Sequence, residues 1–159
     1  MITTETPQKT SGGWVGNTTI LLFDATTPTL QQLYDEILFN RGRKVPLVAV
    51  DPSTGLVADT NLVQIRLTHF VSSLVEVHLS TGKILPCTED TVFYVMREHL
   101  LSIPVRLMRE SDLVYDSSAR VVSVSYITVP TTPVYNVLTD GTRCFFVNPG
   151  VLVQDSYPG

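Results

Sequence analysis

The sequence predicts an all-β domain, and three observations lead to that class. Short runs of β-branched and aromatic residues recur about every ten positions along the chain. Thr-Gly, Asp-Gly and Asn-Pro-Gly turn signals separate several of these runs. A single stretch, residues 30–39, carries apolar residues at helical spacing. Many short strands with one helix are typical of an all-β fold.

The first elements follow from local patterns. Residues 1–13 are polar and end in Ser-Gly-Gly, which is typical of a flexible lead-in. Residues 17–23 are β-branched and apolar and predict a buried strand. The helix of residues 30–39 is preceded by Thr29, and Gln32 three positions later completes a capping-box pattern.

The middle of the chain predicts strands joined by turns. Residues 44–50 form a strand that ends in the Asp-Pro-Ser-Thr-Gly turn of residues 51–55. Residues 62–70 predict the next strand. Residues 74–79 alternate in polarity and return through a Thr-Gly turn into residues 83–85, which is the clearest hairpin of the sequence.

The remaining strands are short and separated by further turns. Residues 97–112 fit neither the strand period nor the helix period, and Pro104 interrupts them. An Asp-Gly pair after residue 139 is a strong hairpin signal. The predicted strands are residues 92–95, 120–129, 134–138, 144–147 and 151–153.

Length and composition limit the class of protein. The 159 residues suffice for one domain with its own core. Hydrophobic residues make up 43% and charged residues 16%, which argues against a disordered chain. The longest apolar runs are about five residues and a membrane helix needs about twenty, so we expect a soluble domain. The first ten residues lack an apolar core, so no signal peptide is expected, and nothing indicates a compartment.

The charge pattern argues against nucleic-acid binding. The net charge of −4 lacks the basic excess that non-specific binding to nucleic acid requires. The only tight basic group is Arg41, Arg43 and Lys44, which a solvated loop tip explains.

The two cysteines do not indicate a scaffold or a metal site. Cys87 and Cys144 are too few for a disulfide framework and lack the C-x-x-C spacing of zinc ligands. We expect two small buried apolar residues; a single disulfide or a stray nucleophile is the alternative. No metal and no cofactor are predicted.

Three separated stretches occur in the order of three segments of one known family. Residues 11–27 contain a glycine followed, after Trp14, by a Thr-Ile strand. Residues 74–91 form a hairpin that leads into Thr88-x-x-Thr91, similar to a T-x-x-H motif. Residues 133–156 are similar to a closing strand pair that ends in His-Asn and then Cys, Ser or Thr. Together they resemble the Hint family, which includes inteins and hedgehog autoprocessing domains.

The resemblance implies a fold, a domain boundary and a kind of partner. It covers residues 14–155 and implies a flattened horseshoe of two pseudo-symmetric β lobes. Residues 1–13 and 156–159 would then be flanks, comparable to the exteins of an intein. Flanking domains of a host protein are the implied partners, and neither nucleic acid nor a membrane is expected.

The resemblance also assigns the first chemical step to a position that cannot perform it. Hint chemistry begins when a thiol or hydroxyl attacks the carbonyl of the preceding residue. The matching position holds Trp14, whose indole N–H is no nucleophile. The T-x-x-H histidine, which serves as acid and base, is replaced by Thr91, although Thr88 is present.

The junction at the end of the domain departs from the family in the same way. The family's His-Asn pair is Gln154-Asp155 here. Glutamine cannot act as a base, whereas aspartate can attack its own backbone carbonyl through a cyclic anhydride. Ser156 is a permitted acceptor, but it has no donor thioester. A variant class of inteins uses a cysteine at the position of Asn136, and that rescue is absent too.

The sequence therefore predicts a Hint-like domain that has lost splicing and serves as a structural or interaction module. The alternative is an autoprocessing domain with residual self-cleavage at the bond between Asp155 and Ser156. A third possibility is an unrelated β domain. The Hint interpretation requires Trp14, Thr88, Thr91 and Asp155 to converge in one central cleft.

Overall fold

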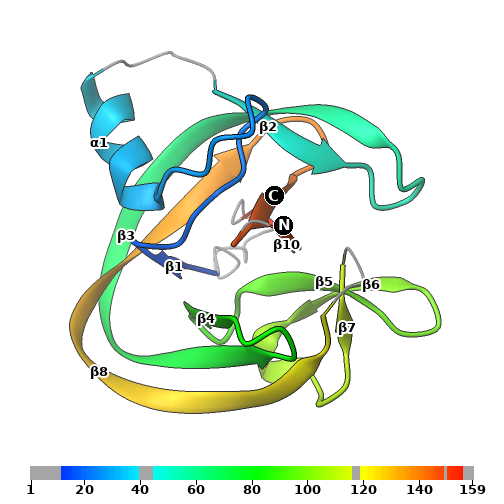
Figure 1. Ribbon diagram of the computed structural model, residues 1–159. Coiled ribbons are helices and arrows are strands. Elements are labelled where there is room, and N and C mark those ends of the chain that lie inside the picture. The colour runs from blue at the N-terminus through cyan, green and yellow to red at the C-terminus, as the bar shows by residue number, and fades with distance from the viewer. Residues whose placement is uncertain (1–11, 40–44, 116–118, 149, 156–159) are drawn as a thin grey trace, which may run out of the picture.

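The computed structural model describes residues 12–39, 45–115, 119–148 and 150–155, without the side chains of residues 37–39 and 68. Most of these residues lie in strands, which confirms the all-β class (Figure 1). The strands are β1 (Trp14–Val15), β2 (Val45–Val50), β3 (Val57–Leu79), β4 (Ile84–Cys87), β5 (Val92–Met96), β6 (Leu100–Pro104), β7 (Leu113–Val114), β8 (Val121–Thr139), β9 (Cys144–Val147) and β10 (Val151–Gln154). The helix α1 (Leu30–Phe39) and the short 3-10 helix η2 (Val105–Leu107) complete the described elements. Within the described ranges, no helix has the length and apolar character needed to cross a membrane.

The strands form two antiparallel sheets. The first has the order β2-β3-β4-β1-β8, with β3 also paired to β8, and the second has the order β6-β5-β10-β9, with β7 paired to β5. The long strands β3 and β8 run side by side around an arc, which gives the horseshoe outline in Figure 1. β10 lies inside that arc.

Irregularities in the β3–β8 ladder accompany its curvature. Between Val71 and Ser73 of β3, the facing residue of β8 moves from Thr132 to Thr128, so β8 takes four steps where β3 takes two. Such a bulge bends the strand and increases its local twist. Pro130, which has no N–H to donate, lies in this irregular segment, where a missing ladder bond is tolerated.

The short strand β1 closes a circuit of strands. Trp14 pairs with Cys87 of β4 on one side and with Tyr135 of β8 on the other. β4 pairs in turn with β3, and β3 pairs with β8. The start of the described chain therefore lies between β4 and β8, in the middle of the first sheet.

The predicted strand at residues 17–23 is wrong. This segment forms only isolated bridges, in which Thr19 faces Thr29, Ile20 faces Val147, and Leu22 faces Leu47. The burial of its side chains nevertheless alternates as in a strand. Thr18, Ile20 and Leu22 are buried, and the residues between them are less buried. The segment contacts three different elements in turn, so it has no single neighbour with which to form a ladder.

Two pairs of predicted strands are each one continuous strand. Residues 62–70 and 74–79 both belong to β3, and residues 120–129 and 134–138 fall in β8 apart from Arg120. In each strand, the alternation of polar and apolar residues is interrupted at the bulge, although the strand continues through it. The ambiguous residues 97–112 contain β6 and η2, and Pro104 ends that strand.

The predicted helix and its cap are confirmed. The helix spans Leu30–Phe39, the Gln32 side chain accepts from the Thr29 N–H at 2.8 Å, and the Gln32 N–H donates to Thr29 Oγ1 at 3.2 Å. These two bonds satisfy backbone groups that the first turn of a helix leaves free. The basic group of residues 41–44 lies outside the described residues.

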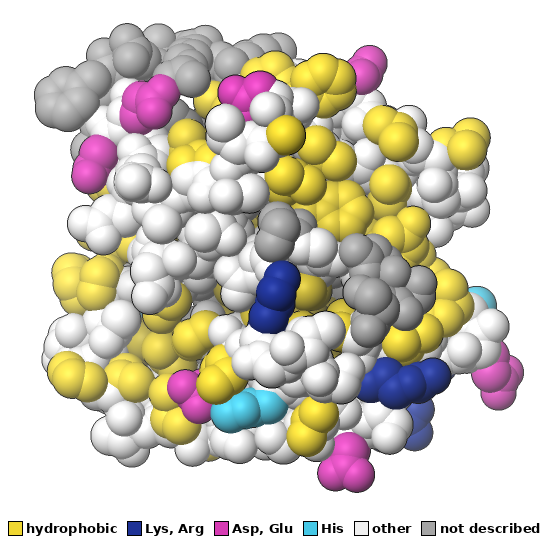
Figure 2. Space-filling model, viewed as in Figure 1, with side chains coloured by type: hydrophobic (Ala, Val, Ile, Leu, Met, Phe, Trp, Pro, Cys, Tyr) yellow, Lys and Arg dark blue, Asp and Glu magenta, His cyan; other side chains and the backbone are white. Residues whose placement is uncertain are grey.

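The core is built from aromatic and branched side chains of both sheets. The largest fully buried side chains include those of Trp14, Phe93 and Phe145. Apolar side chains also reach the surface over much of the face in Figure 2, with few charged groups between them. The most exposed large apolar residues are Phe23, Leu56, Val57, Phe70, Leu107 and Tyr126.

A buried ion pair holds the segment between β6 and β7. Asp112 is 5% exposed, and its carboxylate accepts from Arg97 Nε and Nη2, both at 2.8 Å, in a bidentate arrangement. The Arg109 N–H donates to the same carboxylate at 2.8 Å. Burial raises the pKa of Asp112, but the hydrogen bonds from Arg97 and Arg109 outweigh it and lower the pKa below its ordinary value.

We expect this pair to make stability fall in acid. Because the pKa of Asp112 is lower in the folded chain, its stabilisation is complete above the ordinary carboxyl pKa and is lost as the pH falls through the folded value. Asp112→Asn should therefore be less stable than the wild type at pH 7 and pH 5, and the difference should shrink below about pH 4. Urea unfolding at pH 7, 5 and 3 measures this. A difference that is constant with pH would contradict the expectation.

Candidate functional site

The candidate site is built around the two glycines that lead into β1. Gly12 and Gly13, which the sequence analysis places in the flank, are buried and hydrogen-bonded. Gly12 has φ of 92°, a conformation that glycine adopts without steric cost. A turn between β4 and β5, residues 88–91, faces them.

Thr91 contacts both peptide groups of Gly13. Its Oγ1 accepts from the Gly13 N–H at 3.1 Å and donates to the Gly13 carbonyl at 3.3 Å. The Thr88 N–H donates to the same carbonyl at 3.0 Å. The Thr88-x-x-Thr91 segment therefore contacts the backbone just before Trp14, as the Hint resemblance implies, and its hydrogen bonds centre on Gly13.

Asp90 completes this clamp and was not singled out by the sequence analysis. Its Oδ1 accepts from the Gly12 N–H at 3.2 Å and from Thr88 Oγ1 at 2.7 Å. Thr88 Oγ1 also lies 3.0 Å from Thr91 Oγ1. The available signal was the unbroken run of oxygen-bearing side chains at residues 88–91, which suits the binding of N–H groups. We call the side chains of Thr88, Asp90 and Thr91 the glycine clamp.

Gly13 is held where a side chain would be crowded. A Cβ atom at this position would lie 3.2 Å from Val134 Cβ and 3.6 Å from Asn136 Oδ1. Asn136 is 2% exposed, so its amide belongs to the interior beside the clamp. Any side chain at position 13 would require Val134 to shift slightly.

Trp14 directs its side chain into the core. The indole is 1% exposed and packs against Phe93, with ring centroids 5.5 Å apart. Tilted aromatic pairs at this separation stabilise a core beyond their buried area. The backbone of Trp14 adjoins the clamp, and its ring contributes packing.

Asp155 belongs to a second polar cluster. Its Oδ2 accepts from the Thr139 N–H and from Thr139 Oγ1, both at 3.0 Å, and from Arg143 Nε at 3.1 Å. The Asp155 N–H donates to the Arg143 carbonyl at 2.8 Å. Gln154 is the last residue of β10 and pairs with Cys144 of β9. Ser156 lies outside the described residues.

The strand register relates the two polar clusters. β5 and β10 are antiparallel, with Phe93 opposite Val153. Thr91 precedes Phe93 by two residues and Asp155 follows Val153 by two, so both lie beyond the same end of this pair. Trp14, Thr88 and Thr91 meet around Gly13, whereas the Asp155 carboxylate is bonded to Thr139 and Arg143.

The described residues contain no group of three or more His, Cys, Asp or Glu side chains placed to hold a metal ion.

Comparison with solved structures decides the fold. No family model matches the chain, and no curated protein matches it. The DnaB intein from Synechocystis sp. PCC 6803 matches with a TM-score of 0.71 at 15% identity, over 92% of this chain and 100% of that chain. An intein from a hyperthermophile matches with a TM-score of 0.76 at 16% identity, over 91% and 100%. A bacterial intein-like domain from Clostridium thermocellum matches with a TM-score of 0.72 at 21% identity, over 90% and 98%.

This chain has the intein fold. The matches confirm the fold that the three stretches of sequence imply. With identities of 15% to 21% the likeness concerns the fold, and the activity of those proteins is a separate question.

Within the intein fold, the two cysteines are buried and unpaired with each other. Both are free thiols with 0% exposure, which contradicts the disulfide alternative. Burial raises the pKa of Cys87 to about 12, although a hydrogen bond with Thr91 opposes that rise. Burial also raises the pKa of Cys144, whose Sγ donates to the Val50 carbonyl at 3.1 Å.

We expect both thiols to be unreactive in the folded protein. The thiolate is the reactive form, and a buried thiol with a raised pKa supplies very little of it at pH 8. A colorimetric disulfide reagent should label neither cysteine of the native chain within minutes and both after unfolding in guanidinium. Rapid labelling of one thiol in the native chain would restore that cysteine as a candidate nucleophile.

Proposed function

We propose that the chain is an intein-like Hint domain that cannot splice and that serves as a structural or protein-interaction module within a host protein. The observation that carries this proposal is the glycine clamp. It binds both peptide groups of Gly13, a residue with no side chain, and the next residue directs its indole into the core.

The first step of splicing has no nucleophile in this geometry. An acyl shift needs a thiol or hydroxyl on the residue that follows the attacked carbonyl. Residues 12–15 are Gly, Gly, Trp and Val, so no choice of register within the clamped segment supplies one.

The two threonines of the clamp do not replace the histidine of the family's T-x-x-H motif as acid and base. General acid–base catalysis needs a group whose pKa lies near the working pH, and a threonine hydroxyl is not one. The Thr88 hydroxyl donates to Asp90, so Thr88 Oγ1 and the Gly13 carbonyl remain as acceptors for the single Thr91 proton. These bonds suit a structural role, in which hydroxyls satisfy buried backbone groups.

The test is a fusion of the chain between two folded proteins. The fusion is incubated with and without a thiol or hydroxylamine, and intact mass is followed. We expect the mass to stay that of the full fusion, while an active intein in the same fusion serves as the positive control. Ligated or clipped products that form only when the chain is folded would show that the proposal is wrong.

Residual cleavage after Asp155 is the second candidate, and the burial of that carboxylate beside the end of β10 motivates it. Attack on its own carbonyl would require Oδ1 or Oδ2 to leave Thr139 and Arg143. In the same fusion, Asp155→Ala should abolish a slow clip after this residue. A clip that survives the substitution would exclude the anhydride mechanism.

A further inference from the structure

The edges of the second sheet differ in what covers them. Along β9, the Leu21 N–H donates to the Phe146 carbonyl at 3.0 Å, and beside β7 the Val114 N–H donates to the Ala119 carbonyl at 3.0 Å. β6 pairs with β5, and no other described residue forms a backbone hydrogen bond with it. β6 is therefore the open edge of this sheet within the described chain.

β6 lacks most of the features that protect an edge strand. Such strands are usually blocked by charged side chains, bulges or proline. β6 has the sequence Leu-Leu-Ser-Ile-Pro, carries no charge, and faces β5 in five consecutive pairs without a bulge. Its one proline, Pro104, is the last residue, so residues 100–103 all keep an N–H group. The edge is competent to pair with a further strand.

A further strand at this edge would also cover apolar side chains. Leu101 and Ile103 pack against the hydrophobic core, yet both are only partly buried. Leu107, in η2 directly after β6, is 59% exposed. Removing apolar surface from water favours association. The edge therefore offers hydrophobic contact as well as backbone hydrogen bonds.

Opposite charges flank β6 at equal distances from its centre. Ser102 is the middle residue, Glu98 precedes it by four positions and Arg106 follows it by four. Both charged side chains are exposed, and neither forms an ion pair with another described residue. This pattern is self-complementary, since an antiparallel copy centred on Ser102 brings Glu98 of one chain toward Arg106 of the other.

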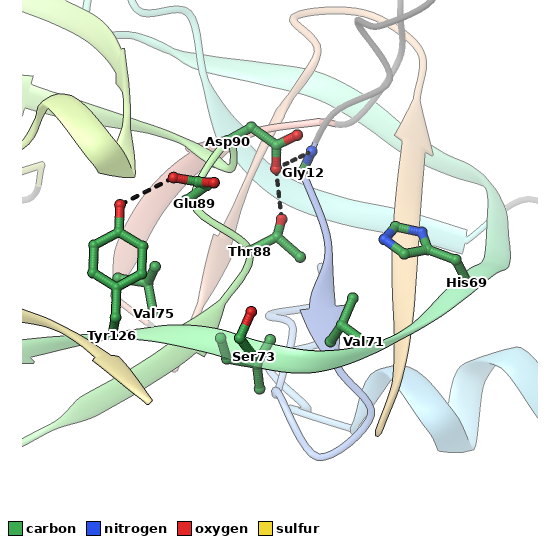
Figure 3. A pocket seen from close by; sticks show the side chains of 10 residues that line it. Gly12, His69, Val71, Ser73, Val75, Thr88, Glu89, Asp90 and Tyr126 are labelled. Atoms are coloured by element: carbon green, nitrogen blue, oxygen red, sulfur yellow. Dashed lines mark hydrogen bonds between the residues drawn. The ribbon is translucent and has the colours of Figure 1, made fainter. Parts of the chain in front are cut away.

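The backbone of Arg106 is fixed at the end of β6. Its N–H donates to the Glu89 carbonyl at 2.9 Å, and the Val105 N–H donates to the Thr91 carbonyl at 2.8 Å. The Glu89 carboxylate accepts from the Tyr126 hydroxyl at 3.0 Å, as Figure 3 shows, and forms no ion pair with Arg106. The start of η2 is therefore anchored, while the Arg106 guanidinium is available to a partner.

We propose that two copies of this chain pair through β6 as antiparallel neighbours about a two-fold axis at Ser102. The second sheet then continues from one copy into the other, and two ion pairs between Glu98 and Arg106, one at each end, fix the register. One short strand edge makes a small interface, so the dimer is weak. The pairing goes beyond the proposed function and is independent of splicing, because it is non-covalent and uses no side chain of the glycine clamp.

Sedimentation equilibrium of the unfused chain tests the dimer. The monomer has a mass of 17.6 kDa. Between loading concentrations of about 10 µM and 1 mM, the weight-average mass should rise from that value toward twice that value, as a Kd between those limits requires. A mass that stays monomeric at about 1 mM would overturn the proposal.

Ser102→Lys tests the position of the axis, because two lysines would then face each other across it. We expect association to be at least about 10-fold weaker, since like charges meet at the centre of the interface. Thr131→Lys is the matched control, because Thr131 is exposed on β8 and its substitution should leave association unchanged. Equal weakening in both variants, or none in Ser102→Lys, would overturn the proposal. Circular dichroism establishes that both variants are folded.

Charge reversal tests the register. Glu98→Arg and Arg106→Glu should each weaken association about 3–10-fold, because each places like charges at both ends of the interface. The double variant restores opposite charges across the dimer and should associate within about 2-fold of the wild type. A double variant that associates no better than either single variant would overturn the proposal.

Ser102→Cys gives a chemical readout of the same axis. Opposite residues of an antiparallel pair have Cβ atoms about 4.5–5.5 Å apart, close to the separation in a disulfide. Cys87 and Cys144 are buried, so the introduced thiol is the accessible one. Mild oxidation should give a covalent dimer of this variant, and Thr131→Cys should stay monomeric. No covalent dimer, as when β6 pairs with a different polypeptide, would overturn the proposal. Self-cleavage of the fusion shortens the chain and dimerisation does not, so the two proposals fail distinguishably.

Discussion

Trp14→Ala is expected to lower the free energy of unfolding by about 3–5 kcal/mol, the range for removing a large buried aromatic side chain. The indole is 1% exposed and contacts Phe93 in the core, so truncation leaves a cavity that the central strand cannot readily fill. Urea unfolding measured by circular dichroism gives the change. Trp14→Cys should cost a similar amount, because it removes the same buried ring.

The control is Phe23→Ala, because Phe23 is 68% exposed and should change stability by less than about 0.5 kcal/mol. The chain has one tryptophan, so its fluorescence reports on this site alone. A blue-shifted emission that moves to the red on unfolding is expected. A loss below about 1 kcal/mol for Trp14→Ala would contradict the core assignment.

Asp155→Ala is expected to lower the free energy of unfolding by about 2–4 kcal/mol. The substitution removes bonds to the Thr139 N–H, the Thr139 hydroxyl and Arg143, and it leaves a buried N–H without its acceptor. Arg143 is 39% exposed and can turn to water, which limits the loss. Urea unfolding of the unfused chain measures it.

Asp155→Asn should fall between the wild type and Asp155→Ala, because an amide oxygen still accepts from Thr139 but has no charge for Arg143. Glu110→Ala, at an exposed acid, is the matched control and should leave stability unchanged. If Asp155→Ala were as stable as the wild type, the carboxylate would have no structural role. Residual self-cleavage after Asp155 would then explain its burial better.

Local patterns predicted the local elements. The helix, its cap and the hairpin of β3 and β4 follow from neighbours in sequence, and each is present. The continuity of β3 and β8 did not follow, because the long ladder between them carries bulges that interrupt the period of two. The segment at residues 17–23 shows the converse, since alternating burial occurs there without a ladder.

The resemblance predicted that residues 88–91 lie beside the segment that precedes Trp14, and their contacts with Gly13 agree with that placement. The resemblance brought Thr88 and Thr91 to the start of the domain, and the structure places them there. Which backbone unit they bind depends on how β1 is inserted between β4 and β8, and that register comes from packing rather than from the local sequence. Asp90 and Asn136 were missed in their present roles because single polar residues in turns and strands usually face solvent.

The position of β1 has a consequence for how the molecule folds. Trp14 meets Tyr135 and Cys87, partners that are remote in the chain, so closing this circuit requires large loops to be ordered first. Domains dominated by such distant pairings fold in milliseconds to seconds, far more slowly than helical bundles. β1 has only two residues and needs both neighbours in place, so we expect it to enter last. Until it does, the hydrophobic interior stays open along its middle.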